Sequence, residues 1–165
     1  MRPSRAHRVE VAPQIAATFA HSTANYSSAF ALRVEDAGTR SPLEWARAVF
    51  EDAPALLRRC IVFGWAHVLG LRLGPLGSAD HVLGWAIADG DLVTGSIALT
   101  AESRFLHASN IVTVEAAGVT WVTLVHYSSA AARPLWALAR PIHHLTIPYL
   151  LTRAARGYAA DSDGA

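Results

Sequence analysis

The segment that begins at Ala132 constrains the fold more than any other stretch of this chain. Its hydrophobic residues recur at the spacing of an α-helix as far as about Gly157. One apolar stripe consists of Leu135, Leu138, Ile142, Leu145 and Tyr149. Roughly opposite it lie Trp136, Ile147 and Leu151. Pro141 and Pro148 each remove a backbone donor and predict a bend. A helix of this length must cover a large apolar surface formed elsewhere in the chain.

That surface is predicted to be an antiparallel sheet, because the hydrophobic period upstream is two. From residue 23, alternate positions are suited to one buried face, namely Tyr26, Ser28, Phe30, Leu32 and Val34. Strand composition returns in residues 81–88, 92–100, 104–116 and 119–128. Asp89-Gly90 and Ala117-Gly118 predict tight turns between successive strands. These segments therefore predict a meander of four or more strands.

Two short helices are expected between the first strand and the meander. Ser41, Pro42 and Glu44 form a capping box with proline at the first helical position. A second helix is expected from Pro54 to about Leu71. We therefore predict an α+β fold, in which a curved antiparallel sheet wraps around the long C-terminal helix and an aromatic-rich space remains between them. Residues 23–157 form this domain, residues 1–22 an N-terminal arm, and residues 158–165 a disordered tail.

Composition excludes several classes of protein. Net charge is +1 and lysine does not occur, so we expect no nucleic-acid partner. Cys60 is the sole cysteine, which rules out an intramolecular disulfide and a cysteine-rich zinc site. No apolar core of a secretory signal follows Met1, so a cytoplasmic location is expected. The longest apolar stretch, residues 60–71, is shorter than the ~20 residues of a membrane span, so no membrane association is expected. The bias toward Arg, Ala and Gly is typical of GC-rich bacterial genomes.

The histidines are the most suggestive titratable residues. None of the eight has the spacing of a helical zinc motif, and no phosphate loop or nucleophile elbow is present, so neither a metal nor a cofactor is predicted. A turn at Ala117-Gly118 places residue 107 near 128 and residue 109 near 126. His107 and His126 would then be diagonal neighbours, able to act as general acid or base if they face the concave side. If they face the convex side, they are surface residues.

Collectively, the aromatic residues suggest a ligand pocket beneath the helix, although ordinary core packing is the better explanation for any single one of them. We predict that the ligand is lined by Tyr26, Phe30, Trp85, Trp121, Leu138, Ile142 and Tyr149. Tyr127 joins His107 and His126 as a candidate catalytic residue, since its hydroxyl can polarise a ligand carbonyl. Hydrophobic residues make up 52% of the chain and charged ones 16%, against ~25% charged in a usual domain. This surplus fits a cavity, a dimer interface or a membrane-facing patch.

Three segments carry a resemblance to a known superfamily. They are Asn25-Tyr26-Ser27-Ser28-Ala29-Phe30, Trp45-Ala46-Arg47-Ala48-Val49-Phe50 and Arg140-Pro141-Ile142-His143-His144-Leu145-Thr146-Ile147-Pro148-Tyr149-Leu150-Leu151. Together with the element order over residues 23–157, they resemble the START-like or SRPBCC superfamily of polyketide cyclases, pollen-allergen-type proteins and lipid-transfer domains. Within it, they look like an uncharacterised bacterial branch classified as a domain of unknown function. The third segment is similar to that branch's Pro-x-His helix, which is followed by Leu-Leu and a basic residue, here Arg153. Where the branch has a His-Leu-Asp-like triplet, this chain has Phe105-Leu106-His107, and the difference weakens any transfer of activity.

The resemblance implies a helix-grip fold with an internal cavity for a hydrophobic small molecule. It further implies a cofactor-independent cyclase or tailoring enzyme of polyketide-type natural-product biosynthesis. Two alternatives remain open. One is a non-catalytic carrier or sensor of a lipid-like ligand. The other is an interaction module, in which Trp136, Ile147 and Leu151 form a homodimer interface or lie against a membrane.

Overall fold

One antiparallel sheet of seven strands forms the framework of the protein. The computed structural model describes residues 5–15, 24–88 and 95–162. Its strands are β1 (His7–Val9), β2 (Tyr26–Arg33), β3 (His81–Val82), β4 (Trp85–Ile87), β5 (Ser96–Glu102), β6 (Leu106–Glu115) and β7 (Gly118–Tyr127). They are hydrogen-bonded in the order β1-β2-β7-β6-β5-β4-β3, so β2 pairs with the last strand, β7. The predicted antiparallel arrangement is confirmed.

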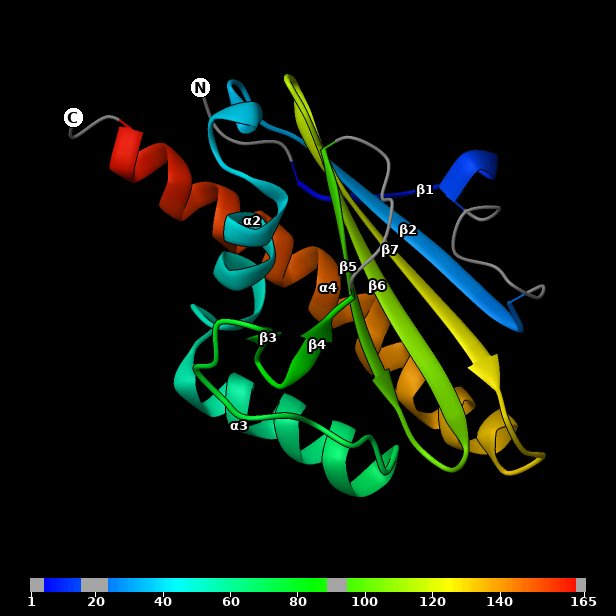
Figure 1. Ribbon diagram of the computed structural model, residues 1–165. Coiled ribbons are helices and arrows are strands. Elements are labelled where there is room, and N and C mark those ends of the chain that lie inside the picture. The colour runs from blue at the N-terminus through cyan, green and yellow to red at the C-terminus, as the bar shows by residue number, and fades with distance from the viewer. Residues whose placement is uncertain (1–4, 16–23, 89–94, 163–165) are drawn as a thin grey trace.

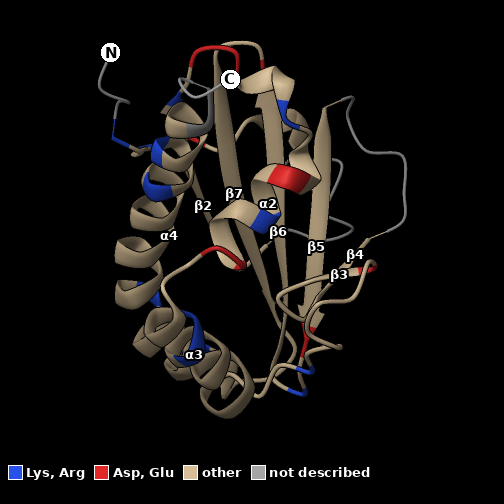
Figure 2. Ribbon diagram, turned by 90° about the vertical axis from the view of Figure 1, so that its left-hand side faces the viewer, with Lys and Arg blue, Asp and Glu red and all other residues tan. Residues whose placement is uncertain are grey.

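The helices lie on one face of the sheet, which we call the inner face. The long helix α4 (Ala132–Ser162) runs across it (Figure 1). Next to α4 is α2 (Pro42–Phe50), which follows a 3-10 turn, η1 (Ala37–Thr39). Below α2 lies α3 (Ala55–Phe63), which continues into a π-helical segment, η2 (Gly64–Val68) (Figure 2). This is the predicted α+β helix-grip arrangement, with a long terminal helix and two short helices after the first long strand.

The start of α2 follows the predicted capping box. The backbone N–H of Glu44 donates to Oγ of Ser41 at 3.3 Å, and the backbone N–H of Ser41 donates to the Glu44 carboxylate at 2.7 Å. Pro42 occupies the first turn, where its missing N–H has no helical partner to lose. These local signals determine where α2 begins on the inner face of the sheet.

The helix α4 packs on the sheet with the side opposite to the one we expected. The stripe expected to face the sheet is largely exposed, with Leu138 and Ile142 each 64% and Leu145 76% accessible to solvent. The buried positions are Ala132, Trp136, Ile147, Leu150, Leu151, Ala154, Ala155 and Tyr158. Helical spacing alone does not choose between two apolar stripes. The buried stripe is longer, and its alanines allow close approach to the sheet. The suggestion that Trp136, Ile147 and Leu151 form an external interface is therefore wrong.

Both ends of the domain also differ from the sequence prediction. The expected N-terminal arm includes an edge strand, since β1 pairs with β2 in the register Arg8↔Phe30. The sequence predicted a disordered tail from residue 158, whereas α4 continues to Ser162. Within this last part of the helix, Tyr158 packs against Trp45 with tilted rings whose centroids are 5.5 Å apart, and its hydroxyl donates a hydrogen bond to the carbonyl of Asp36 at 2.8 Å. Residues 163–165 lie outside the described part of the chain.

Two strand predictions are refined by backbone conformation. Residues 81–88 form two short strands, because Leu83 and Gly84 both have positive φ and reverse the chain between β3 and β4. The predicted Ala117-Gly118 reversal between β6 and β7 is confirmed by the pairing Glu115↔Gly118. The Asp89-Gly90 turn lies outside the described residues.

The opposite face of the sheet, which we call the outer face, has a separate small core. Its buried members are Ala29, Ala98, Ile111, Val122 and Leu124, and partly buried hydrophobic residues packed on them include Val9, Val11 and Ile15. Because side chains alternate between faces, each strand residue can be assigned to one core or the other. This assignment decides which polar residues reach the space under α4.

Candidate functional site

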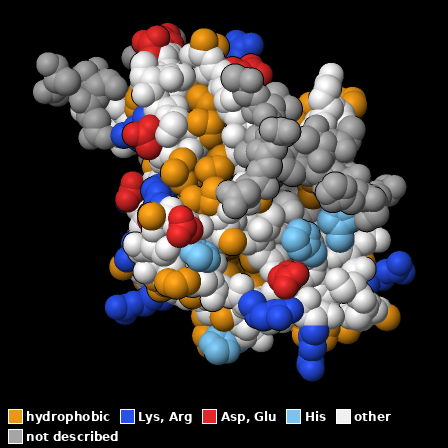
Figure 3. Space-filling view, in the orientation of Figure 1, with side chains coloured by type: hydrophobic (Ala, Val, Ile, Leu, Met, Phe, Trp, Pro, Cys, Tyr) orange, Lys and Arg blue, Asp and Glu red, His pale blue; other side chains and the backbone are white. Residues whose placement is uncertain are grey.

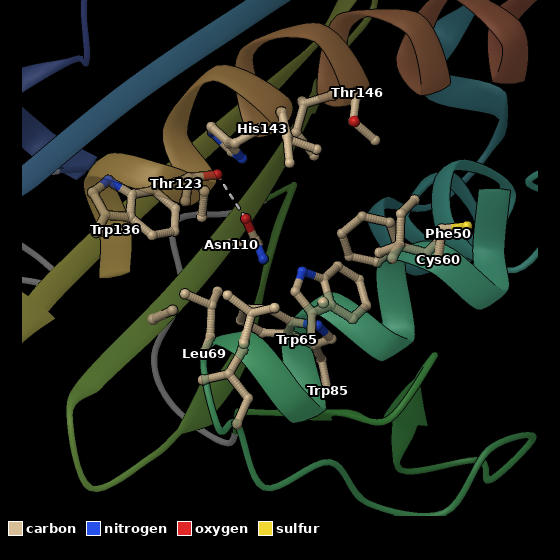
Figure 4. Close-up of a pocket in the computed structure, with 18 of the residues that line it drawn as sticks. Phe50, Cys60, Trp65, Leu69, Trp85, Asn110, Thr123, Trp136, His143 and Thr146 are labelled. Atoms are coloured by element: carbon tan, nitrogen blue, oxygen red, sulfur yellow. Dashed lines mark hydrogen bonds between the residues drawn. The ribbon is translucent and has the colours of Figure 1, made fainter. Parts of the chain in front are cut away.

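A cavity of about 390 Å³ lies between the inner face of the sheet, the α3–η2 segment and α4 (Figure 4). The two central strands of the sheet contribute Ala108 and Asn110 from β6 and Thr123 from β7. The remaining wall consists of Phe50, Leu57, Cys60, Ile61, Gly64, Trp65, Val68, Leu69, Leu71, Trp85, Trp136, Leu138, Ala139, Ile142, His143, Thr146 and Ile147. No Arg, Asp or Glu side chain is among the described residues of this wall. The space is therefore apolar, with a few neutral polar groups.

Aromatic rings form a continuous part of the wall. Phe50 contacts Trp65 with ring centroids 5.0 Å apart, and Trp65 contacts Trp85 at 5.3 Å, both in edge-to-face geometry. Such contacts are favourable beyond simple burial. The rings come from α2, η2 and β4, so one side of the cavity is held by three separate elements.

The cavity reaches solvent between α3 and α4. Leu138 and Ile142 line it and yet are largely exposed, so they lie at its rim. On the facing side, Cys60 and Val68 also line it and are exposed. None of the residues of α3 is buried. The mouth is therefore bordered by hydrophobic side chains from two helices.

Asn110 supplies the best-defined polar group of the cavity. Its Oδ1 accepts hydrogen bonds from the indole N–H of Trp121 at 3.1 Å and from the hydroxyl of Thr123 at 2.7 Å. Asn110, Trp121 and Thr123 are all buried. The carboxamide nitrogen points toward the cavity, on the side away from the bond to Thr123 (Figure 4).

The indole N–H of Trp85 is buried behind the cavity wall. Trp85 is 3% exposed and lines the cavity, and its Nε1 has no hydrogen-bond partner within the described residues. A buried donor without a partner costs about 1–3 kcal/mol.

His143 brings a titratable side chain to the cavity wall. Burial, and to a lesser extent the neighbouring His144, lowers the pKa of His143 to about 4. Its Nε2 lies 3.1 Å from the Ser28 hydroxyl on β2. The imidazole is therefore neutral near pH 7 and adds no charge to the cavity.

The adjacent His144 attaches α4 to the same strand. The Tyr26 hydroxyl lies 2.5 Å from Nε2 of His144. Burial raises the pKa of Tyr26 and lowers the pKa of His144. Two consecutive histidines of α4 thus bind two inner-face residues of β2, and only His143 extends to the cavity.

Three of the seven predicted ligand-binding residues line the cavity, namely Trp85, Leu138 and Ile142. The other four do not. Tyr26 and Phe30 pack against the histidines of α4, and Trp121 lies behind Asn110. Tyr149 is 52% exposed on the solvent side of α4.

The predicted catalytic histidines lie together but outside the cavity. His107 and His126 are directly paired in the β6–β7 ladder, with ring centroids 6.4 Å apart, rather than diagonal as the sequence suggested. Both alternate with inner-face residues such as Ala108 and Val125, so they lie on the outer face. Burial and the proximity of His107 lower the pKa of His126. Tyr127 is half-buried beside the inner core but does not line the cavity.

Sequence reasoning missed the polar residues of the cavity. Asn110 stands among apolar residues of β6, which is a signal of a buried polar role, but the face it occupies depends on register. His143 and Thr146 were missed because the wrong stripe of α4 was assigned to the sheet. Trp65 lies on a π-helical segment that was predicted as ordinary helix.

No group of three or more His, Cys, Asp or Glu side chains in residues 5–15, 24–88 and 95–162 is arranged to hold a metal ion. None of the helices described is both long enough and apolar enough to cross a bilayer. The chain matches no protein-family model, no curated protein and no solved structure. Functional inference therefore depends on the geometry of the cavity and of the surface around its mouth.

Proposed function

We propose that the protein binds an uncharged, hydrophobic small molecule in the cavity beneath α4. The observation that supports this is an apolar space of about 390 Å³, open between α3 and α4 and without Arg, Asp or Glu among its described wall residues. Small-molecule sites are commonly ~300–1,000 Å³ with a few polar groups in an apolar wall. An apolar ligand gains about 25 cal/mol for each Å² removed from water, whereas an ionised one finds no counter-ion here.

The catalytic form of this proposal is a cofactor-independent cyclase of polyketide-type biosynthesis. Such an enzyme holds a flexible chain in a reactive conformation, and the cavity offers donors that would orient a carbonyl. The carrier or sensor form requires the same binding step and no chemistry. It is favoured by the neutral state of His143, which leaves the described cavity wall without a histidine that titrates near pH 7. Comparing the products of a linear poly-ketone chain with and without the protein separates the two forms.

A matched pair of variants tests the binding step. Ala139 lines the cavity, whereas Ala137 is exposed on the same helix and does not. The neutral fluorophore N-phenyl-1-naphthylamine should bind the native protein saturably, with an increase in emission. Ala139→Phe should abolish this increase by filling the cavity, and Ala137→Phe should leave it unchanged. Equal binding by both variants, or no binding by the native protein, would contradict the proposal.

A second candidate function is docking on an anionic membrane surface, and it rests on the charged and exposed hydrophobic side chains of the two helices that border the cavity mouth. Helix α3 and residues 132–160 of α4 carry six arginines and no acidic residue (Figure 2). The arginines are Arg58, Arg59, Arg133, Arg140, Arg153 and Arg156. Exposed hydrophobic side chains on the same helices are Leu56, Phe63, Leu138, Ile142, Leu145 and Tyr149. Figure 3 shows arginine and hydrophobic side chains next to one another along the lower edge of the molecule, in the region of α3.

A surface that combines positive charge with exposed apolar groups is complementary to an anionic lipid membrane. It is less suited to self-association through the same surface, because the positive charges of the two copies would repel each other. The test is co-sedimentation with phosphatidylglycerol-containing vesicles and with phosphatidylcholine vesicles. Binding only to the anionic vesicles, reduced by added salt and by Leu145→Glu, is expected. A stable dimer without vesicle binding would contradict this candidate and assign the face to self-association.

A further inference from the structure

Only the NH₂ end of the Asn110 carboxamide is left for a ligand once the contacts of the carboxamide with the protein are counted. Trp121 Nε1 donates to one end of the carboxamide at 3.1 Å, and an indole N–H can only donate. The atom it meets must therefore be oxygen, so the two N–H bonds are at the other end. The Thr123 hydroxyl, at 2.7 Å from the same oxygen, is satisfied by the same assignment.

The nitrogen end has no partner among the described residues and is directed at the cavity. Asn110 is 3% exposed, and its Nδ2 makes no hydrogen bond with any residue the structure describes. Figure 4 shows this nitrogen pointing into the space between β6 and the tryptophans of the opposite wall. Most polar groups inside folded proteins have a hydrogen-bond partner, so an amide donor that faces an apolar cavity is free to bind an acceptor placed there.

We infer that Asn110 binds an acceptor oxygen of the ligand, and that Trp121 and Thr123 are positioning residues that fix the carboxamide with its donors toward the cavity. The inference rests on the proposed ligand-binding function and specifies its substrate class. The ligand is an apolar, uncharged molecule that carries a carbonyl oxygen, for which a donor in an otherwise apolar wall provides one oriented contact.

Two probes of nearly the same shape isolate the oxygen. Diphenylmethane and benzophenone differ in a single group, CH₂ against C=O. The native protein should bind benzophenone about fivefold to tenfold more tightly, because one neutral hydrogen bond contributes about 1 kcal/mol. In ¹⁵N-correlated spectra of the native protein, benzophenone should shift the side-chain amide resonances of Asn110, and diphenylmethane should shift them far less.

Variants then assign the effect to the residue. Asn110→Ala should remove the preference for benzophenone while leaving diphenylmethane affinity within about twofold. Trp121→Phe should reduce the preference, since it removes the donor that fixes the carboxamide. Ser109→Ala is the matched control, because Ser109 is the adjacent buried residue of β6 and faces the outer side. It should keep the native preference.

The outcomes separate this inference from the function on which it rests. If both probes bind equally to the native protein, or if Asn110→Ala keeps the preference, the role of Asn110 is wrong and the cavity function stands. If neither probe binds, the cavity function itself is wrong. Should Asn110→Ala fail to fold, the amide resonances of the native protein decide, because a ketone-specific shift requires contact at that side chain.

Discussion

Ser28 on β2 and His143 on α4 meet beneath the long helix, with the serine hydroxyl 3.1 Å from Nε2 of the histidine. Beside them, Tyr26 and His144 form a second contact between the same two elements. These two contacts join the helix to the sheet next to the cavity. They also make the stability of the protein sensitive to protonation, because both histidines are partly withdrawn from water.

The free energy of unfolding should fall as pH decreases from about 6.5 to about 4. Burial lowers the pKa of His143 to about 4 in the folded protein, whereas an unfolded histidine titrates near 6.5. Between these values the unfolded state binds a proton that the folded state does not. His143 alone should therefore remove up to about 3 kcal/mol across this interval. Urea unfolding followed by circular dichroism at several pH values measures the slope.

His143→Gln should flatten that slope, although His144 retains part of it because its pKa is also lowered. Arg8 and Arg140 lie near His144 and act in the same direction on it. The exposed His67 provides the control, since His67→Gln should leave the slope unchanged. An unaltered slope in His143→Gln would contradict the assigned burial.

A pair of identical substitutions tests which side of α4 packs on the sheet. Leu151 is fully buried, and Leu151→Ala should lower the free energy of unfolding by about 2–5 kcal/mol. Leu145 is 76% exposed, and Leu145→Ala should change it by no more than about 0.5 kcal/mol. Chemical denaturation of both variants gives the comparison. A larger loss at Leu145 would mean that the helix packs in the orientation the sequence first suggested.

The turn between β6 and β7 should accept no side chain at Gly118. A Cβ atom there would lie 2.7 Å from the carbonyl oxygen of Leu32 on the adjacent strand, so Gly118→Ala should cost about 1–3 kcal/mol. Gly38 is the matched control, because a Cβ there would come no closer than 3.8 Å to Ala116. Thermal unfolding of the two alanine variants should differ clearly. Equal stability would show that β2 and β7 separate without cost at this point.

Replacement of the outer-face histidines should leave ligand binding unchanged. His107→Gln and His126→Gln alter a pair on the side of the sheet that does not line the cavity. N-phenyl-1-naphthylamine should therefore bind both variants with native affinity in a fluorescence titration. A loss of affinity in either variant, with the fold intact by circular dichroism, would extend the functional site to the outer face.

The sequence was sufficient for features that depend on local chemistry. The capping box at Ser41 and Glu44 and the reversal at Gly118 lie where residue type predicted them. The period of two correctly identified Tyr26, Ser28, Phe30 and Leu32 as one face of a strand, and the order of elements was sufficient for the α+β helix-grip fold. These features require only interactions between near neighbours or a simple rule of burial.

Features that depend on strand register or on how elements pack together could not be predicted from the sequence in the same way. The choice between the two apolar stripes of α4 depends on how closely the helix approaches the sheet. The face of His107 depends on the alternation of β6, which has apolar residues on both sides. Asn110 becomes recognisable as a donor only when Trp121 and Thr123 are placed beside it. The candidate site was therefore only partly predicted, through Trp85, Leu138 and Ile142.

The lack of buried residues in α3 has a consequence for how the proposed ligand would enter and leave the cavity. Elements with little buried surface open at low free energy, well before the sheet does. Since Leu57, Cys60 and Ile61 of this nine-residue helix form one side of the cavity, its local opening widens the passage while α4 stays attached to β2. The exchange rate of a bound ligand should then follow the rate of local opening of α3. Amide hydrogen exchange measures this opening directly.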